Sequence, residues 1–321
     1  MDRVAFFKNA YMVTEIDIAG TFIYRGMREF NSLDSFYNAG EIFHVLYPLS
    51  VGIERLQKVL LVLLEEIRPE QAHEFEKRLI THSHRELHDW IVEKLIIKLN
   101  QHENRFLDML AHFYNTCRYN RFNFMGDLYQ ERTSLVTFLE ESLKITIDND
   151  SIFVTPNDDR IKRFWGRIVG SISRAYYRKI TEVAGGLGLF SYELRSDSAA
   201  YKVFMPSFAD ESLQRQYENE QVAFKELVIY LMNSKHSNSL LSFMRDIPPI
   251  NLDVALIQEH LSRMLKYDIS QSLIDEVACL YEEEVEDISS RIELLKVIGN
   301  DGVIFPEESE EDDEWDIGHD H

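Results

Sequence analysis

Two arginines and a tyrosine share one face of a helix that the sequence predicts over about 103–122. At roughly 100° per residue, Tyr114, Arg118 and Arg121 fall on one flank of an apolar stripe. An arginine offers a planar fork of donors, and a tyrosine ring stacks or donates a hydrogen bond, so this face could hold a phosphate group. Alternatively, the two arginines form ion pairs with the many acidic side chains of the chain and have a structural role.

Three histidines lie close together at His82, His84 and His88. His84 and His88 are four residues apart on one helical face, a spacing that permits metal binding. The zinc-protease pattern HExxH is absent, however, because position 85 is an arginine, and no third ligand is visible. The sequence therefore predicts no metal ion and no other cofactor.

The position of His82 is a stronger signal than its neighbours. Ser83 and Glu86 have the spacing of a capping box, so a helix should begin near His84 and place His82 just before its N-terminus. Backbone N–H groups at such an end favour anions, and a histidine there could move protons at a bound phosphate. Alternatively, these histidines only cap the helix and pack against its neighbours.

The charge of the chain is large and unevenly distributed. The net charge is −21, which repels nucleic acid and anionic membranes at long range, and residues 301–321 contain ten acidic residues with no lysine or arginine. In contrast, residues 160–179 contain seven basic residues. Four of these basic residues are candidate ligands for nucleic acid: Arg163, Arg167, Arg174 and Arg178. The acidic tail could imitate a polyanion, engage a basic protein partner, or simply be a disordered solubilising segment.

The composition indicates a helical globular protein. Of 321 residues, 45% are hydrophobic and 28% charged, and only 13 glycines and 7 prolines are present, too few for a fold made of many turns. Two distant cysteines exclude a disulfide framework, the N-terminus lacks the apolar core of a signal peptide, and the longest apolar run is far short of a membrane span. A cytoplasmic protein without membrane association is expected.

Apolar periodicity predicts a mainly α fold, a helical bundle with additional C-terminal helices. Between Leu46 and Ile67 apolar residues recur in heptads and also cover other faces, which is typical of a central helix with Pro48 as a kink or first turn. Residues 145–154 alternate around Asn-Asp and predict either a short β-hairpin or a loop. We expect a bundle over 1–150, a second helical region over 151–305 and a disordered acidic tail over 306–321. Other helices are predicted near 70–80, 84–99, 130–146, 158–184, 210–234, 253–266 and 271–298.

Several of these segments together resemble the higher eukaryote and prokaryote nucleotide-binding (HEPN) helical superfamily. The resemblance covers about residues 30–145, under half of the chain. It rests on Phe36-Tyr37-Asn38, on Ser50 to Lys58, on Thr81 to Leu87, on Phe113-Tyr114-Asn115 and on Arg118 to Phe122.

This resemblance implies a bundle of four or more helices that dimerises. Many members are metal-independent ribonucleases of bacterial anti-phage and toxin–antitoxin systems, in which an arginine and a histidine four to six residues beyond it act at the scissile phosphate. The present sequence has no histidine at that distance from Arg118 or Arg121. The fold could therefore hold without the activity, or His82 or His84 could meet these arginines across the bundle.

Three functions are open as hypotheses. In the first, the protein binds or cleaves RNA, with His82 or His84 as the acid/base, Arg118 and Arg121 on phosphate, and Tyr114 or Tyr119 against a base. In the second, it is a non-catalytic helical interaction protein that forms a homodimer and uses its acidic tail on a basic partner. A regulator that binds a small nucleotide is a third hypothesis, which only the arginine cluster supports.

Overall fold

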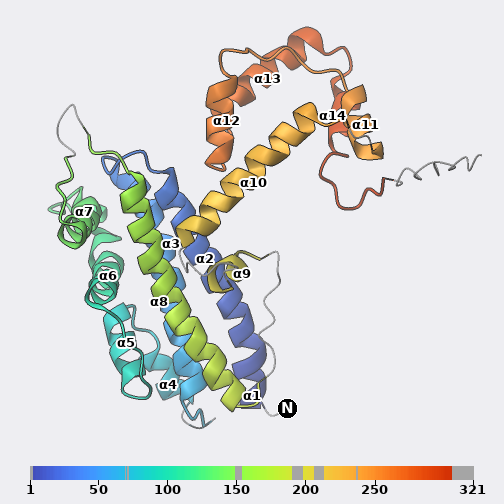
Figure 1. The fold of residues 1–321 in the computed structure, drawn as a ribbon. Helices are drawn as coiled ribbons and strands as arrows, with labels where there is room; N and C mark the ends of the chain where they lie inside the picture. Colours follow the sequence, from blue (N-terminus) through green and yellow to red (C-terminus); the bar gives the residue numbers. More distant parts are fainter. Residues whose placement is uncertain are drawn as a thin grey trace, which may run out of the picture. The chain divides into compact units, whose positions relative to one another are not determined.

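The structure, a computed structural model, describes residues 3–68, 70, 72–148, 154–189, 198–205, 213–235 and 238–305. Helices make up most of these residues and none belongs to a β-strand; an isolated antiparallel bridge joins Ser35 to Pro156. The prediction of a mainly α helical bundle with further C-terminal helices is thus confirmed (Figure 1). Half of the predicted hairpin, 149–153, and the whole predicted tail, 306–321, lie outside the described residues.

The chain divides into two compact units, residues 1–219 and 220–321. The sequence suggests a boundary near residue 150, but helix α8 (Asp159–Gly186) packs on the N-terminal helices within the first unit. Its aromatic side chains explain why. Trp165 stacks on Phe30 with 4.2 Å between ring centres and meets the edge of Phe106 at 5.2 Å, so α8 closes the same core.

Helices α2 (Met12–Ser32) and α3 (Ala39–Leu64) form the central antiparallel pair. Small residues allow a close approach: a Cβ atom added at Gly52 would lie 2.6 Å from Ile23 Cγ1 and 2.9 Å from the Ala19 carbonyl oxygen. Asn38 caps α3 by accepting from the Gly40 and Glu41 backbone N–H groups. Helix pairs that touch this tightly are rigid, so they can hold side chains in fixed positions.

Helix α3 is the buried centre that the heptad pattern predicts. Its heptad residues Leu46, Leu49, Ile53, Leu56, Leu60 and Leu63 are all buried, and α2, α5, α6, α7 and α8 each contact it. Pro48 lies well inside the helix rather than in its first turn.

Shorter helices complete the first unit. Some predicted segments are divided in the structure: 84–99 ends as a helix at Val92, and 103–122 becomes α6 followed by a π-helical turn and a 3₁₀ turn. The extra residue in a π turn rotates the residues after it about the helix axis. The elements are η1 (Phe7–Tyr11, also π-helical), α4 (Ala72–Arg78), α5 (His84–Val92), α6 (Gln101–His112), η3 (Phe113–Cys117, π-helical), η4 (Asn120–Phe122), α7 (Gln130–Leu143) and α9 (Ala199–Phe204).

The second unit is built from short helices, and α10 (Leu213–Asn233) leads into it. The predicted helix over 271–298 is two helices, because the segment around Val285 is not helical. His260 is buried here, with its ring nitrogens 3.2 Å from the Ser270 hydroxyl and 3.2 Å from the Glu276 carboxylate. The helices of this unit are α11 (Ser239–Asp246), α12 (Ile257–Leu265), α13 (Gln271–Glu284) and α14 (Ile288–Leu295).

A buried polar network joins α3, α5 and α8 in the first unit. Gln57 donates to the His84 carbonyl at 2.8 Å and to the Tyr176 hydroxyl at 2.9 Å, and that hydroxyl lies 2.8 Å from His88 Nδ1. His84 Nε2 donates to the Ser50 carbonyl at 2.9 Å. Burial lowers the pKa of both histidines, so both are neutral in the folded protein.

Acid should therefore destabilise the first unit. The unfolded chain protonates both histidines near their usual pKa of 6.5, whereas the folded pKa values are lower. Their contribution to stability is complete above about pH 6.5 and is lost as the pH falls below it. We expect the urea midpoint to fall between pH 7.5 and 5.5, and to fall less in His84→Gln. The exposed-site variant His73→Gln should keep the wild-type pH dependence; an equal flattening in both variants would contradict this account.

The α2–α3 contact gives a second prediction. Gly52→Ala should lower the free energy of unfolding by about 1–3 kcal/mol, because the new methyl group has no room. Gly185→Ala is the matched control: no atom lies within 4 Å of a Cβ there, and alanine favours the helix by up to about 1 kcal/mol. Urea unfolding monitored by circular dichroism measures both. Equal stability of the two variants would show that the helices are not in close contact at Gly52.

Candidate functional site

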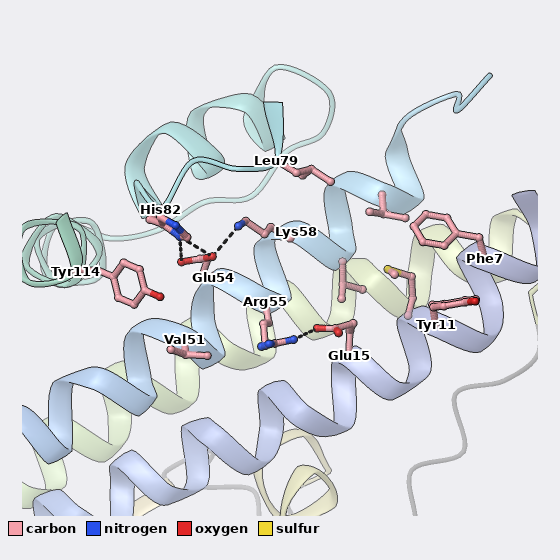
Figure 2. A pocket seen from close by; sticks show the side chains of 13 residues that line it. Phe7, Tyr11, Glu15, Val51, Glu54, Arg55, Lys58, Leu79, His82 and Tyr114 are labelled. Carbon is pink, nitrogen blue, oxygen red and sulfur yellow. Dashed lines mark hydrogen bonds and ion pairs between the residues drawn. The ribbon is translucent and has the colours of Figure 1, made fainter. Parts of the chain in front are cut away.

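One face of α3 forms the floor of a pocket of about 470 Å³. The lining residues are three and four positions apart, as neighbours on a helical face must be. Three charged residues lie between apolar ones, so this face differs from the purely apolar heptad face. The α3 residues of this floor are Val51, Glu54, Arg55, Lys58, Val59 and Val62. Figure 2 shows the charged side chains among them, Glu54, Arg55 and Lys58, on neighbouring turns of the helix.

Both π-helical turns contribute walls. Phe7 and Tyr11 come from η1, and Tyr114 comes from η3, whose extra residue appears as the Arg118 N–H donating to the Phe113 carbonyl at 3.0 Å. Lys8 fastens η1 to the end of α3, where its ammonium group donates to the Leu63 and Glu65 carbonyls at 3.0 and 2.6 Å. π turns are frequent at functional sites because they redirect side chains.

Glu54 is the centre of the charged cluster. Its side chain is only 10% exposed, and it accepts from Lys58 at 2.6 Å and lies 3.2 Å from His82 Nδ1. A second ion pair, between Arg55 and Glu15, lies on the same floor (Figure 2). A carboxylate this far from water is expensive unless it is paired, so Lys58 and His82 compensate for its burial.

His82 is held over Glu54 by the start of α5. Ser83 is the N-cap, as predicted, and accepts from the Glu86 N–H; the Glu86 carboxylate accepts from the Thr81 hydroxyl at 2.7 Å instead of closing a full capping box. His84, which follows Ser83, is bonded to α3 through the Ser50 carbonyl and the Gln57 side chain. With Nδ1 on the Glu54 carboxylate, Nε2 is the nitrogen left for a ligand, and the His82 side chain is 42% exposed.

The structure thus separates the two candidate histidines. His82 lines the pocket, whereas His84 has no exposed surface and its Nε2 is bonded to a backbone carbonyl. His84 is a structural residue that positions His82, and a direct role at a ligand is closed to it.

Tyr114 lies beside His82, and Arg118 lies beside Tyr114, as the spacing of these two residues on one helical face predicts. The His82 and Tyr114 rings are 5.0 Å apart, and the guanidinium carbon of Arg118 is 3.9 Å from the centre of the Tyr114 ring. Burial, and then the negative charge of Glu54, raise the pKa of the Tyr114 hydroxyl, so it remains a proton-bearing donor. Arg118 is also 4.5 Å from the centre of the exposed Tyr119 ring.

The remaining candidates do not line this pocket. Arg121 forms an ion pair with Glu131, whose side chain is almost wholly buried, so its charge has an internal partner. The four candidate arginines of α8 differ: Arg174 is buried in the bundle, and the other three are exposed on its surface. These three are Arg163, Arg167 and Arg178.

Glu54 and Lys58 are pocket residues that the sequence reasoning did not single out. Both belong to the segment Ser50 to Lys58, and the available signal was a pair of opposite charges at i and i+4 within an otherwise apolar helix. A charge inside a buried helix needs a partner, but the sequence does not show that the partner is His82, 28 residues away.

The described residues contain no candidate metal cluster, and the comparisons with known proteins found no match. Within the part of the chain that the structure describes, no group of three or more His, Cys, Asp and Glu side chains could hold a metal ion, and no helix has both the length and the apolar character that crossing a membrane requires. No protein-family model matches the chain, and no curated protein and no solved structure is significantly similar to it.

The geometry predicts different reactivities for the two histidines. Diethyl pyrocarbonate acylates accessible neutral imidazoles, so it should modify His82 much faster than His84, whose ring is fully buried. Peptide mapping by mass spectrometry at pH 7 measures both rates in one sample. The exposed His73 provides the rate of an unhindered histidine. Modification of His84 at the rate of His73 would show that α5 does not pack on α3 as described.

Proposed function

We propose that the protein binds RNA and cleaves it without a metal ion, with His82 as the acid/base. One observation is the main support: an imidazole with its Nδ1 on a buried carboxylate stands at an open pocket beside Lys58, Tyr114 and the neighbouring Arg118. A carboxylate that holds one ring nitrogen of a histidine fixes the tautomer and stabilises the imidazolium that forms on proton uptake.

The chemistry suited to these groups is transesterification at a phosphodiester. His82 Nε2 accepts the proton of a ribose 2′-OH while the 2′-oxygen forms a bond to the adjacent phosphorus. The bond from phosphorus to the 5′-oxygen breaks, and the imidazolium returns the proton to that oxygen. Lys58 and Arg118 offset the negative charge that develops on the phosphoryl oxygens, and Tyr114 donates a hydrogen bond.

Membership of the HEPN superfamily is part of this proposal. Glu54, Arg55 and Lys58, together with His82, lie in two of the segments on which the resemblance rests, and those segments meet at the pocket. Homodimer formation, residence in the cytoplasm and a role in bacterial defence or toxin biology stay predictions from the sequence.

A second function is favoured by a separate observation. Arg121 and Arg105 are both engaged internally, through Glu131 and Glu141, as expected if the arginines of this region only stabilise the bundle. In that case the protein is a non-catalytic interaction module. The pocket charges then serve only to hold α2, α3 and the start of α5 together.

Cleavage of a mixed RNA pool in the presence of EDTA tests the proposal. We expect the wild type to cleave, and His82→Ala to lose about 10²–10⁴-fold in rate, the usual contribution of a general acid/base. Arg118→Ala should also be slower because a phosphate ligand is lost. Glu54→Gln should be slower at a given pH because a neutral amide stabilises the imidazolium less well.

His73→Ala is the matched control, since His73 is an exposed histidine outside the pocket. It should cleave at the wild-type rate. Absence of wild-type cleavage above background, or equal losses in His82→Ala and His73→Ala, would remove the catalytic assignment in favour of the interaction module.

A further inference from the structure

The loop between α6 and α7 has an inverted distribution of side chains. Residues 119–129 are here called the aromatic loop. Polar side chains of this loop form hydrogen bonds with its own backbone: Asn120 donates to the Asp127 carbonyl at 2.8 Å, and the Asp127 carboxylate accepts from the Tyr129 N–H at 2.9 Å. The loop is further tightened at Gly126, where an added Cβ would collide with the Asn120 carbonyl. These bonds fix a compact turn.

Large apolar side chains point outward from this turn. Phe122 is 87% exposed, Phe124 is 100% exposed and Met125 is 85% exposed, and Tyr119 and Tyr129 are exposed beside them. A loop whose polar groups bond its own backbone while its aromatic groups lie in water departs from the usual balance of burial. Exposed apolar clusters of this kind mark recognition surfaces.

Cations are interleaved with these rings. Arg118 lies over Tyr119, and Arg132 lies with its guanidinium carbon 4.3 Å from the centre of the Tyr129 ring. The acids of the segment already have internal partners, because Asp127 accepts from the backbone and Glu131 pairs with Arg121. Aromatic faces alternating with guanidinium groups suit a ligand with flat rings on an anionic backbone.

Arg118 connects this surface to the pocket. Its guanidinium group contacts Tyr114, which lines the pocket, and Tyr119, which begins the aromatic loop. The ring of Phe122 comes next, with its centre 6.4 Å from that of Tyr119. A strand with one phosphate at His82 could therefore extend its next bases over these rings without crossing a gap.

We propose that the aromatic loop is a stacking platform for unpaired bases, so that the ligand of the pocket is single-stranded RNA. This inference rests on the proposed function and specifies its substrate class. A chain with a net charge of −21 repels RNA at long range, so stacking must supply much of the affinity. Unpaired bases expose their faces, whereas those of a duplex are covered by their neighbours.

Fluorescence anisotropy with labelled 12-nucleotide RNAs tests the platform. All proteins contain His82→Ala so that the RNA stays intact, and the probes are an unstructured strand of alternating A and C and a duplex of equal length. The double variant Phe122→Ala/Phe124→Ala should weaken binding of the single strand at least about tenfold, since each stacked base is worth about fivefold or more. Duplex binding should be weak with or without the loop substitutions.

Ile96→Ala is the matched control, because Ile96 is an exposed apolar residue of the same unit outside the loop. It should bind the single strand as the parent protein does. Because the loop side chains make few packing contacts, both variants should also keep the parent's unfolding midpoint.

The outcomes separate the two proposals. Cleavage by the wild type with unchanged single-strand affinity in the double variant would overturn the platform alone. Loss of single-strand affinity in the double variant, without any cleavage by the wild type, would support the platform and reject catalysis. A double variant that changes only the oligomeric state, measured by light scattering, would overturn the platform and identify the loop as an interface between copies.

Discussion

Helix α3 is largely enclosed by neighbouring helices, so each buried polar group that it contains needs a partner inside the protein. Gln57 and the Ser50 carbonyl both bond to His84 and so fix α5 on α3, whereas Glu54 pairs with His82 and Lys58. These two sets of bonds depend on each other. The first fixes where α5 begins, and the second depends on that position, because His82 stands two residues before His84. Loss of the buried network would therefore disturb the pocket without changing any residue that lines it.

Local patterns in the sequence were sufficient for several elements. The heptads of α3 and the N-cap at Ser83 were predictable because both depend on residues within a few turns of each other. The neighbouring positions of Tyr114 and Arg118 were predictable from helical spacing as well. The pairing of Glu54 with His82 was not predictable, since it depends on how two distant segments pack. Nor was the burial of Arg174, whose sequence neighbours are typical of a solvated basic face.

The site combines rigid and exposed parts in a definite order. Glu54 stands on a closely packed helix and His82 stands just before the N-cap of another, whereas the aromatic loop is held by short-range bonds of its own. Placing reactive groups on a rigid scaffold preserves their geometry, and placing contact groups on a surface loop leaves the scaffold untouched when those contacts change. Arg118 belongs to both parts, since its guanidinium group touches a ring on each side.

The continuous helical segment from α6 into η3 makes the length of the chain as important as its composition. Deleting one residue within α6 would rotate Tyr114 and Arg118 together by roughly 100° about the helix axis, so Tyr114 would leave the ring of His82 although neither residue had been altered. Deleting one residue within η3 would instead remove the extra residue of the π turn and restore regular helical pitch. Substitution scanning would overlook this dependence. Among descendants of this gene, single-residue insertions and deletions within α6 should consequently be purged more strictly than amino-acid replacements.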